Sequence, residues 1–360
     1  MAPSSIPKTP PQPIQRNLLA GGSVSSFSDE SFAEAVNLIK DHDPEFRFGV
    51  FVEGAGQKFD SWETRRHNEK APDWVILALK KPSEVSSCEI DTKWHLGNHA
   101  EFSSLYGCLW EEEGVPTPDS KWDLLVERHK LEGHARHLFN FPKKKLSHVK
   151  LTNDPDGGIS RLRLYEEPAD QSGTIFHEEE VPGVKHAKIA DKSPDSIQKA
   201  REKVSGEPVI NLASFDLGAT VVESSNERYG DSKQLLFDSP PINMGDGWET
   251  ARTRERSGFQ YVKIKLAYTG QIKEVRFDYK YFIFNNPLEM ELFGTNSETQ
   301  KEEVLIERMR VKEFAGKSLA VKIENPGEFS HLTLRHYPCG GVNRMQVLGN
   351  SSAGQYGFFV

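Results

Sequence analysis

The stretch FDSWETRRHNE, Phe59 to Glu69, returns in the second half of the chain as MGDGWETARTRE, Met244 to Glu255. A Trp-Glu-Thr triplet followed by arginines therefore occurs twice. Each copy precedes a segment that alternates apolar with polar residues, Ala71 to Leu79 and Phe259 to Leu266. Such alternation is typical of a half-buried β-strand. The recurrence indicates a duplicated structural unit.

Four blocks of similar sequence occur in the same order in both halves. Besides the Trp-Glu-Thr blocks, they are Gly21–Ile39 with Gly218–Leu236, Cys88–Gly107 with Val275–Gly294, and Leu146–Tyr165 with Phe329–Gly349. The offsets between matching residues are 197 for Ser28/Ser225, 186 for Trp62/Trp248, 187 for Asp91/Asp278 and 183 for Gly157/Gly340. One order at nearly one spacing identifies an internal repeat.

Short alternating segments, separated by Gly-Gly or Asn/Pro turns, dominate each half. We therefore predict an all-β protein of two tandem jelly-roll-like antiparallel β-sandwich repeats, each of about 150 residues. Helical patterns are sparse: Ser28–Ile39, capped by Ser28 or Asp29, and Ser193–Ser205 in the connector. The expected organisation is a disordered Pro-rich tail 1–17, repeat one 18–166, a polar linker 167–211, repeat two 212–350 and a C-terminal tail 351–360.

Composition limits the classes of function. The chain of 360 residues has 45 basic and 53 acidic residues and a net charge of −8, which argues against nucleic acid as a partner. Its three cysteines have no CxxC spacing, so neither a disulfide framework nor a zinc knuckle is indicated. No apolar run approaches the roughly 18 residues of a membrane span, and no signal-peptide core is present. We expect a cytoplasmic protein with no membrane partner.

The first Trp-Glu-Thr motif offers groups for acid–base chemistry. An extended chain places Glu63 and Arg65 on one face. Trp62, Thr64 and Arg66 then lie on the other face. An arginine can bind a carboxylate or a ureido oxygen, and a neighbouring glutamate can transfer a proton. The alternative is a structural Glu–Arg ion pair beside a tryptophan that fills the core.

The segment IDTKWHLGNHA ends a strand and begins a turn. Asp91 closes the strand, and the Gly97-Asn98 turn presents Asn98 and His99 to a small polar ligand. The alternative is that Asp91 caps the turn and Asn98 only tolerates a left-handed backbone. His95 and His99 are four residues apart outside a helix, so no metal site is predicted.

Two further segments supply candidate side chains. PDGGISRLR reads as a hairpin whose Arg161 and Arg163 project to one side, where one of them could face a ligand. In GHARHLFNF, His137 is either a structural hydrogen-bonding group or a proton carrier. No phosphate-binding loop, G-x-S-x-G elbow, HExxH motif or Cys-His arrangement occurs.

The repeated segments FSDESFAEAVNLI, SWETRRHN, EIDTKWHLGNHA, RHLF and PDGGISRLRLY together resemble the allantoicase family of ureide-degrading hydrolases. The resemblance covers nearly the whole chain apart from the tail and the linker. It implies jelly-roll repeats, a possible homo-oligomer, and conversion of allantoate and water to ureidoglycolate and urea. The partner implied is a small-molecule substrate, and no cofactor is expected.

The resemblance selects residues at the matching positions. It implies five candidate catalytic residues, namely Glu63, Asp91, His99, Glu249 and Asp278. It also implies substrate contacts from Arg65, Arg66, Asn98, Asp246 and Arg252. Trp62, Trp94, His137 and Arg161 are further candidate substrate contacts.

Departures from the family pattern leave alternatives open. Ser61 replaces a glycine, and Cys339 replaces the Asp of Pro-Asp-Gly-Gly. Phe284 stands where the family has a turn glycine, which should alter that loop if the glycine adopts positive φ. Together with Trp94, Tyr279 and Tyr281, it would suit a larger and more apolar ligand. The alternatives are a paralogue recruited to dehydration, cyclisation or cycloaddition in a fungal natural-product pathway, and a binding protein without catalysis.

Overall fold

The computed structural model describes residues 16–52, 56–169, 175–177, 201–204, 206–253 and 255–352. Most of the expected N-terminal tail, much of the linker and residues 353–360 lie outside them. The chain forms two compact units. Unit 1 contains the described residues of Met1–Glu45, Asp60–Thr64 and Lys70–Glu179, and unit 2 those of Phe46–Phe59, Arg65–Glu69 and Glu180–Val360. The domain boundaries expected from sequence remain a prediction.

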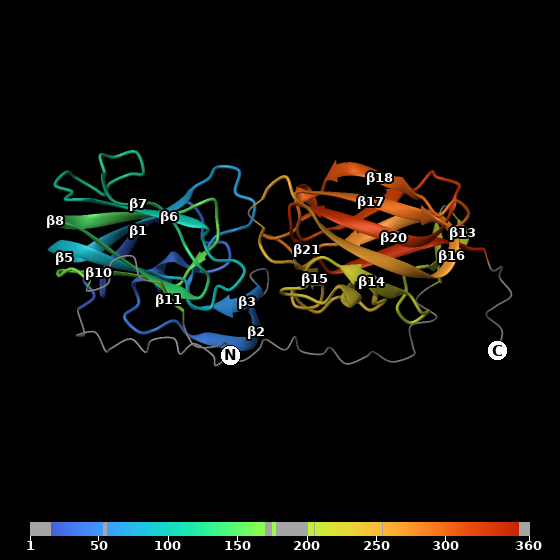
Figure 1. The fold of residues 1–360 in the computed structure, drawn as a ribbon, viewed down its shortest axis with the longest axis horizontal. Coiled ribbons are helices and arrows are strands. Elements are labelled where there is room, and N and C mark those ends of the chain that lie inside the picture. The colour runs from blue at the N-terminus through green and yellow to red at the C-terminus, as the bar shows by residue number, and fades with distance from the viewer. Residues whose placement is uncertain are drawn as a thin grey trace, which may run out of the picture. The chain divides into compact units, whose positions relative to one another are not determined.

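Unit 1 consists of antiparallel strands, whose order in the main sheet is β1-β5-β8-β6-β7, with β10 on β5 and β11 on β8 (Figure 1). A small separate ladder joins β4 to β9. The strands are β1 Ser23–Phe27, β4 Trp62–Glu63, β5 Asp73–Asp91, β6 Phe102–Cys108, β7 Asp123–Lys130, β8 Ala135–Asn153, β9 Gly158–Ile159, β10 Arg161–Tyr165 and β11 Ile175–His177.

Two long strands run through both layers of unit 1. The register between β5 and β8 shifts between Ala78 and Ser83. Before that shift β5 pairs with β1 and the end of β8, and after it β5 pairs with β10 and the beginning of β8. Irregularities of this kind bend strands and let them change sheets. The arrangement confirms the predicted antiparallel β-sandwich.

Unit 2 repeats this plan, in the order β12-β13-β22-β16-β20-β17-β18, with β14 and β19 also on β16. Two strands, β19 and β20, pair with β16 where unit 1 uses the single long strand β8. The strands are β2 Phe46–Val52, β3 Gly56–Phe59, β12 Arg201–Val204, β13 Glu207–Asn211, β14 Thr220–Ser224, β15 Trp248–Glu249, β16 Gln260–Asp278, β17 Glu289–Asn296, β18 Glu302–Arg310, β19 Ser318–Lys322, β20 Glu328–Tyr337, β21 Gly341–Val342 and β22 Arg344–Ser351.

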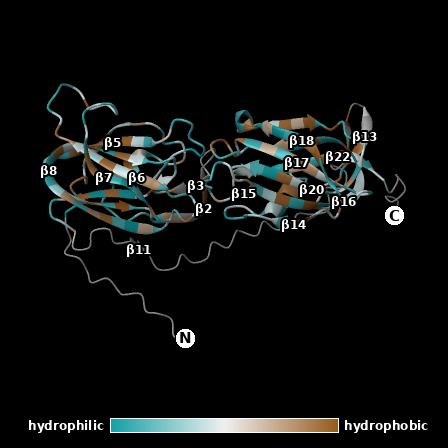
Figure 2. Cartoon of the chain, turned by 45° about the horizontal axis from the view of Figure 1, so that its top comes forward, coloured by the Kyte–Doolittle hydropathy of each residue, from teal (hydrophilic) through white to brown (hydrophobic). Residues whose placement is uncertain are grey.

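Each unit has its own apolar core. Hydrophobic and hydrophilic residues alternate along the strands (Figure 2), so that one face of each strand turns inward. Val75 and Leu77 belong to the core of unit 1, and Val262 and Ile264 to that of unit 2. The motif tryptophans Trp62 and Trp248 are both 0% exposed and lie in these cores.

The helical expectations were largely wrong. Ser28–Ile39 contains only the 3-10 turn η1, Ala35–Ile39, as helical structure. Ser28 Oγ donates to Asp73 (2.8 Å), and Asp29 accepts from Ser31 N–H (3.1 Å) in a local turn that no α-helix follows. Of Ser193–Ser205, residues 193–200 lie outside the described residues, and Arg201–Val204 is a strand. The other short turns are η3 Ser232–Leu236 and η4 Lys312–Phe314. No helix in the described part of the chain has the length and apolarity to traverse a membrane.

Candidate active site

The Trp-Glu-Thr motif of unit 1 forms a corner at the edge of the sandwich. Trp62 fills the core while its indole Nε1–H donates to the Asp29 carbonyl (2.8 Å). Glu63 pairs with Gly158 in the β4–β9 ladder. Thr64 N–H donates to the Gly157 carbonyl (3.0 Å), and Gly157 N–H donates back to Thr64 Oγ1 (3.2 Å). The first glycine of the Asp-Gly-Gly turn is thereby fastened to the motif.

Unit 2 builds the same corner. Trp248 Nε1–H donates to the Asn226 carbonyl (2.8 Å), Glu249 pairs with Gly341, and Thr250 exchanges hydrogen bonds with Gly340 (3.2 and 3.1 Å). The motif is therefore repeated because it forms the same structural corner twice. Any difference in chemistry must come from the side chains that surround each glutamate.

The Gly-Gly turns leave space for one aromatic ring beside each corner. Gly157 has φ of 146°, a conformation that L side chains rarely adopt. A Cβ on Gly158 would lie 2.1 Å from Cε1 of His95, and one on Gly341 would lie 2.1 Å from Cε1 of Phe282. The second glycine thus makes room for a ring. That ring is an imidazole in unit 1 and a phenyl in unit 2.

In unit 1 a carboxylate, an amide and an imidazole form a chain of hydrogen bonds. Asn98 Nδ2–H donates to Glu63 Oε1 (2.8 Å), and His95 Nδ1 lies 3.2 Å from Asn98 Oδ1. Because that amide oxygen can only accept, His95 Nδ1 carries the proton and Nε2 is the basic nitrogen of the neutral ring. Glu63 is 4% exposed and His95 0% exposed. The arrangement fixes the orientation of two groups that can transfer protons.

A second carboxyl near this corner has a perturbed pKa. Asp73 begins β5 and accepts a hydrogen bond from Ser28 Oγ (2.8 Å). Burial raises the pKa of Asp73 to about 6, the hydrogen bonds of Ser28 and Thr64 oppose this rise, and the nearby charges of Asp29 and Asp156 add to it. Asp73 therefore changes charge near neutral pH. Sequence reasoning missed it, although an aspartate at the head of an apolar strand was a visible signal.

In unit 2 the corresponding glutamate is held in a buried ion pair. Asn285 Nδ2–H donates to Glu249 Oε1 (2.6 Å), and Arg66 Nη2–H donates to the same oxygen (2.7 Å). Arg66 is 4% exposed, and its Nη1 also donates to the Thr250 carbonyl (2.9 Å) and lies 3.7 Å from Cys339 Sγ. Burial alone would lower the pKa of Arg66, but Glu249, Cys339 and Tyr229 together outweigh it and raise that pKa. The pair neutralises the glutamate of unit 2.

The two corners differ in several of their ionisable groups. Unit 2 carries an apolar or uncharged side chain at each of four positions where unit 1 has an imidazole or a carboxyl. By repeat alignment and strand register the pairs are His95/Phe282, Asp156/Cys339, Asp73/Gln260 and Asp29/Asn226. Unit 1 is therefore the better equipped of the two for acid–base chemistry.

Some predicted residues gather at these corners, and others do not. Asn98 contacts Glu63, and Arg66 contacts Glu249. Trp62, Thr64 and Arg66 are all buried and Arg65 is exposed, as the expected alternation requires. Glu63, however, is buried too and does not share the exposure of Arg65. Arg252 Nη1–H donates to the Arg65 carbonyl (3.2 Å).

Three predicted residues make contacts typical of a structural role. Arg161 is 0% exposed and pairs with Asp60, and Asp246 pairs in the same way with Arg344 (2.8 Å). His137 is held at both nitrogens: Nε2 accepts from Glu132 N–H (2.9 Å) and Nδ1 lies 3.1 Å from the Ile90 carbonyl.

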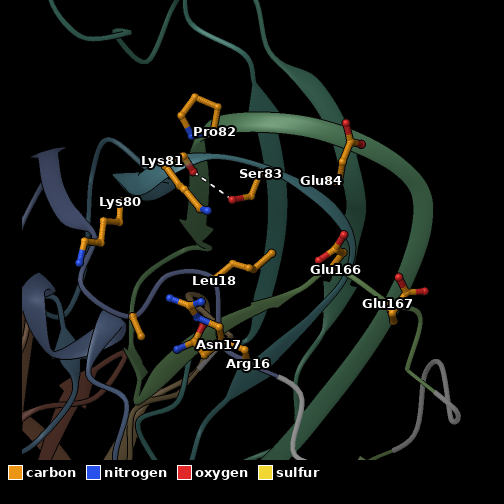
Figure 3. A pocket seen from close by; sticks show the side chains of 11 residues that line it. Arg16, Asn17, Leu18, Lys80, Lys81, Pro82, Ser83, Glu84, Glu166 and Glu167 are labelled. Atoms are coloured by element: carbon orange, nitrogen blue, oxygen red, sulfur yellow. Dashed lines mark hydrogen bonds between the residues drawn. The ribbon is translucent and has the colours of Figure 1, made fainter.

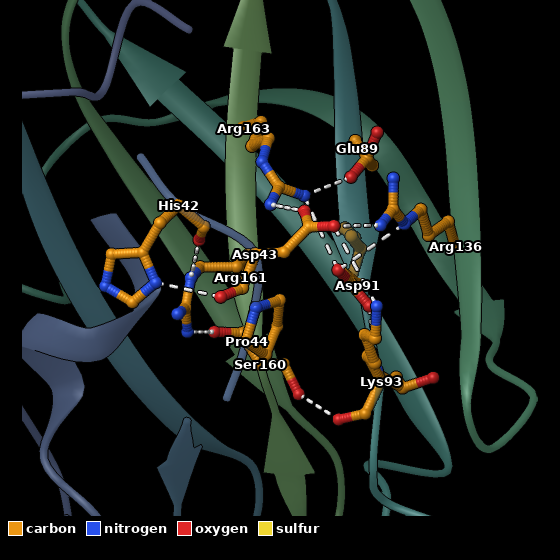
Figure 4. A network of polar contacts seen from close by, with 12 residues as sticks. His42, Asp43, Pro44, Glu89, Asp91, Lys93, Arg136, Ser160, Arg161 and Arg163 are labelled. Atoms are coloured by element: carbon orange, nitrogen blue, oxygen red, sulfur yellow. Dashed lines mark hydrogen bonds and ion pairs between the residues drawn. The ribbon is translucent and has the colours of Figure 1, made fainter. Parts of the chain in front are cut away.

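The two strand-end aspartates lie in different surroundings. Asp91 is 0% exposed and lies among Arg136, Arg163 and Glu89 (Figure 4). Burial raises its pKa to about 6, Glu89 adds to the rise, and the two arginines oppose it. Asp278 is half-buried and accepts from Lys280 N–H (2.8 Å).

The remaining predicted residues and substitutions are placed as follows. His99 is half-buried, and its backbone bridges to Gly158. Trp94 Nε1–H donates to the Pro44 carbonyl (2.9 Å). Tyr279 is fully buried in the core of unit 2 and so does not line an open pocket. Gly97 is not among the described glycines with positive φ, which explains how Phe284 can occupy the matching position.

A surface hollow of about 740 Å³ lies at the bend of β5 in unit 1 (Figure 3). It contains none of the residues selected from the sequence. Both basic and acidic side chains line it, with Lys80 and Lys81 on one side and Glu84, Glu166 and Glu167 on the other (Figure 3). The full lining is Arg16, Asn17, Leu18, Ala20, Lys80, Lys81, Pro82, Ser83, Glu84, Glu166 and Glu167.

Potential metal ligands do not converge in the described residues. Within these ranges no three His, Cys, Asp or Glu side chains form a group that could hold a metal ion. The three cysteines, Cys88, Cys108 and Cys339, are buried and form no disulfide.

Comparison with known proteins identifies related sequences over nearly the whole chain. The allantoicase repeat family model matches residues 16–169 and 210–352. A probable allantoicase of Schizosaccharomyces pombe is 32% identical over 345 residues, covering 92% of this chain and 91% of the relative. The allantoicase of Saccharomyces cerevisiae is 34% identical over 344 residues, covering 91% of each. A solved structure of allantoicase is 29% identical, with 93% of each chain covered and a TM-score of 0.37.

Proposed function

Because this chain belongs to the allantoicase family, we propose that it hydrolyses a ureide, converting allantoate and water to ureidoglycolate and urea. We further propose that the reaction takes place in unit 1, around Glu63. Curated relatives that carry the allantoicase name support the reaction. The choice of site rests on the hydrogen bonds that link Glu63, Asn98 and His95. In unit 2, Phe282 occupies the position of His95, so the matching glutamate has no imidazole at that position.

The chemistry requires two proton transfers. Allantoate carries one carboxylate and two ureido groups on a single carbon, and the reaction breaks one C–N bond there. The departing ureido nitrogen must gain a proton, and the water that forms the new C–O bond must lose one. Glu63 serves as the base that accepts the proton of water. His95, protonated at both nitrogens before this step and oriented by the hydrogen bond of Nδ1–H to Asn98, delivers its Nε2 proton to the leaving nitrogen. The proton that Glu63 gained then returns to His95 Nε2, so that the two transfers balance over the cycle.

Asp73 supports this assignment electrostatically. A carboxyl whose pKa lies at about 6 is present in both protonation states near neutral pH, which is the property that a proton-transfer group needs. Its hydrogen-bond partner Thr64 follows Glu63 directly in the chain. We assign to Asp73 the role of gaining or losing a proton as charge develops on the substrate, so that the net charge around Glu63 stays nearly constant.

Matched variants of the two glutamates test the proposal. Urea release from allantoate is measured for the wild type, Glu63→Gln and Glu249→Gln. We expect Glu63→Gln to lose about 10²- to 10⁴-fold in kcat, the usual contribution of general acid–base catalysis. Glu249→Gln keeps kcat within a few-fold but lowers Tm, because Arg66 loses its charged partner.

The outcomes separate the parts of the proposal. If Glu249→Gln abolishes urea release and Glu63→Gln does not, the reaction stands but the site belongs to unit 2. If the folded wild type releases no urea from allantoate, the reaction itself is refuted, and the recruited paralogue becomes the leading alternative.

A further inference from the structure

Three basic side chains of unit 1 surround one carboxylate of the same chain (Figure 4). Asp43 accepts from Arg136 Nη2 (3.0 Å) and Arg163 Nη2 (3.1 Å), and Lys93 Nζ lies 3.8 Å away. The bases stand on or directly after strands: Arg136 on β8, Arg163 on β10, and Lys93 two residues after the end of β5. Asp43 instead lies in an irregular segment between η1 and β2, and its side chain is 58% exposed. It is the most accessible member of the cluster.

The two guanidinium groups are oriented by buried carboxylates behind them. Arg163 Nη1 binds Glu89 and lies 3.4 Å from Asp91, and Arg136 Nε lies 3.8 Å from Asp91. Glu89 and Asp91 are 8% and 0% exposed. The inner edges of both guanidinium groups are therefore held by the strands, and an Nη2 of each turns toward Asp43. Such fixed N–H donors match the planar geometry of a carboxylate.

Charge at this cluster balances only when Asp43 is counted. With both buried carboxylates ionised, the three bases and these two acids leave one positive charge, which Asp43 neutralises. Burial alone would raise the pKa of Asp43, but Arg136, Arg163 and Lys93 outweigh it and lower that pKa. Without Asp43, the N–H groups of Lys93, Arg136 and Arg163 would face the position of its carboxylate, and the three bases with the two buried acids would carry one net positive charge.

We propose that Lys93, Arg136 and Arg163 form a binding site for a small monocarboxylic acid anion, and that Asp43 is the internal ligand which such an acid displaces. A monocarboxylate supplies the same planar group and the same single charge as Asp43. A dianion such as sulfate would instead reverse the excess charge, from one positive to one negative unit. The proposal is independent of the ureide reaction.

The contacts of the Asp43 segment provide a spectroscopic reporter. Trp94 Nε1–H donates to the carbonyl of Pro44, the residue after Asp43 (2.9 Å), and Arg161 Nε–H donates to the carbonyl of His42, the residue before it (3.0 Å). Displacement of Asp43 therefore pulls on the partner of the Trp94 indole. Tryptophan emission that shifts to longer wavelength in the wild type but not in Trp94→Phe would report release of the segment.

The experiment titrates the full chain with sodium acetate or formate, holding ionic strength constant with chloride. We expect the Trp94 emission to shift at tens of millimolar acetate, because a tethered competitor has an effective concentration in the millimolar range. Asp43→Ala removes that competitor, so acetate should bind it at least tenfold more tightly and raise its Tm. Sulfate at equal ionic strength should produce neither effect.

Combined variants control for folding and for nonspecific salt effects. Asp43→Ala/Arg136→Gln keeps the two buried contacts of Arg163 and should lose the acetate response while retaining the circular dichroism spectrum of Asp43→Ala. Equal stabilisation of both variants by acetate would refute the site. Acetate binding by Asp43→Ala without any Trp94 response in the wild type would also overturn the proposal, since Asp43 would then be a permanent ion-pair partner. Neither outcome depends on whether allantoate is a substrate.

Discussion

His336 offers a quantitative test of the packing of unit 2. It is 0% exposed on β20, and its ring stacks on Trp248 with centroids 5.0 Å apart. Neither ring nitrogen has a hydrogen-bond partner within the described residues. Burial lowers the pKa of His336 from 6.5 to about 3. We predict that replacing it with Phe removes a large part of the acid sensitivity of the protein.

The sign and size follow from proton linkage. The unfolded chain takes up the His336 proton below pH 6.5, whereas the folded chain resists it until about pH 3. The stability associated with the neutral ring is thus fully present above pH 6.5 and is lost as the pH falls from 6.5 to about 3. At pH 5, one and a half pH units below the unfolded value, the loss is about 2 kcal/mol. At pH 7.5 it is close to zero.

The assay is urea denaturation at pH 7.5 and pH 5.0, followed by tryptophan fluorescence. His336→Phe keeps a ring against Trp248 but cannot be protonated, so its unfolding free energy should fall by about 2 kcal/mol less than that of the wild type between the two pH values. His331→Phe is the matched control, because His331 lies half-buried on the same strand and should change the pH dependence much less. Equal pH dependence in wild type and His336→Phe would show that His336 is not buried as a neutral group.

Further predictions concern the two corners. Gly158→Ala should lower turnover at least tenfold by displacing the imidazole beneath it, whereas Gly341→Ala should lower Tm and spare turnover; equal effects on turnover would contradict the division between the units. Asp73→Asn should raise the unfolding free energy by roughly 2–3 kcal/mol at pH 7.5, because the pKa of the folded carboxyl is raised to about 6; the cost of ionising it in the folded chain grows as the pH rises from about 4 and is complete above about pH 6. The gain should disappear near pH 4, which denaturation at both pH values will check. Arg66→Met should cost about 3–5 kcal/mol by leaving a buried carboxylate unpaired, and adding Glu249→Met should restore much of it, as a double-mutant cycle would measure.

The repeat was the most informative sequence signal, since residues at one offset perform one structural task. Trp62 and Trp248 are both fully buried, and both donate to a backbone carbonyl. Thr64 and Thr250 both exchange hydrogen bonds with the first glycine of the Gly-Gly turn of their unit. The repeat predicted that both halves would build the same unit, and the alternative in which the tryptophan fills the core fits Trp62, but the hydrogen bonds of Thr64 and Thr250 to the Gly-Gly turns at these corners were not predicted. The contacts of the glutamate beside them were predictable only in part.

The failures arise where the chain leaves regular structure. Alternation placed Glu63 with Arg65, but β4 ends at Glu63, and Glu63 is buried while Arg65 is exposed; Arg66 is buried like Trp62, yet alternation does not identify its partner. Its partner Glu249 is 183 positions away, and strand periodicity carries no information about such a pair. The raised pKa of Asp73 likewise depends on burial and on neighbouring carboxyls that only the folded chain brings together.

The assignment of Phe46–Phe59 and Arg65–Glu69 to unit 2 has a consequence for dissecting this protein. In unit 2, Gly56 packs on Met244 and Phe51 on Gly245. A fragment truncated after Glu179 would retain these two segments but lose the surface that receives them. Exposed apolar strand β2 would then favour aggregation. Biochemists who express the halves separately should transplant both segments onto the C-terminal fragment, or produce the two fragments together so that the segments of the N-terminal fragment can pack on unit 2.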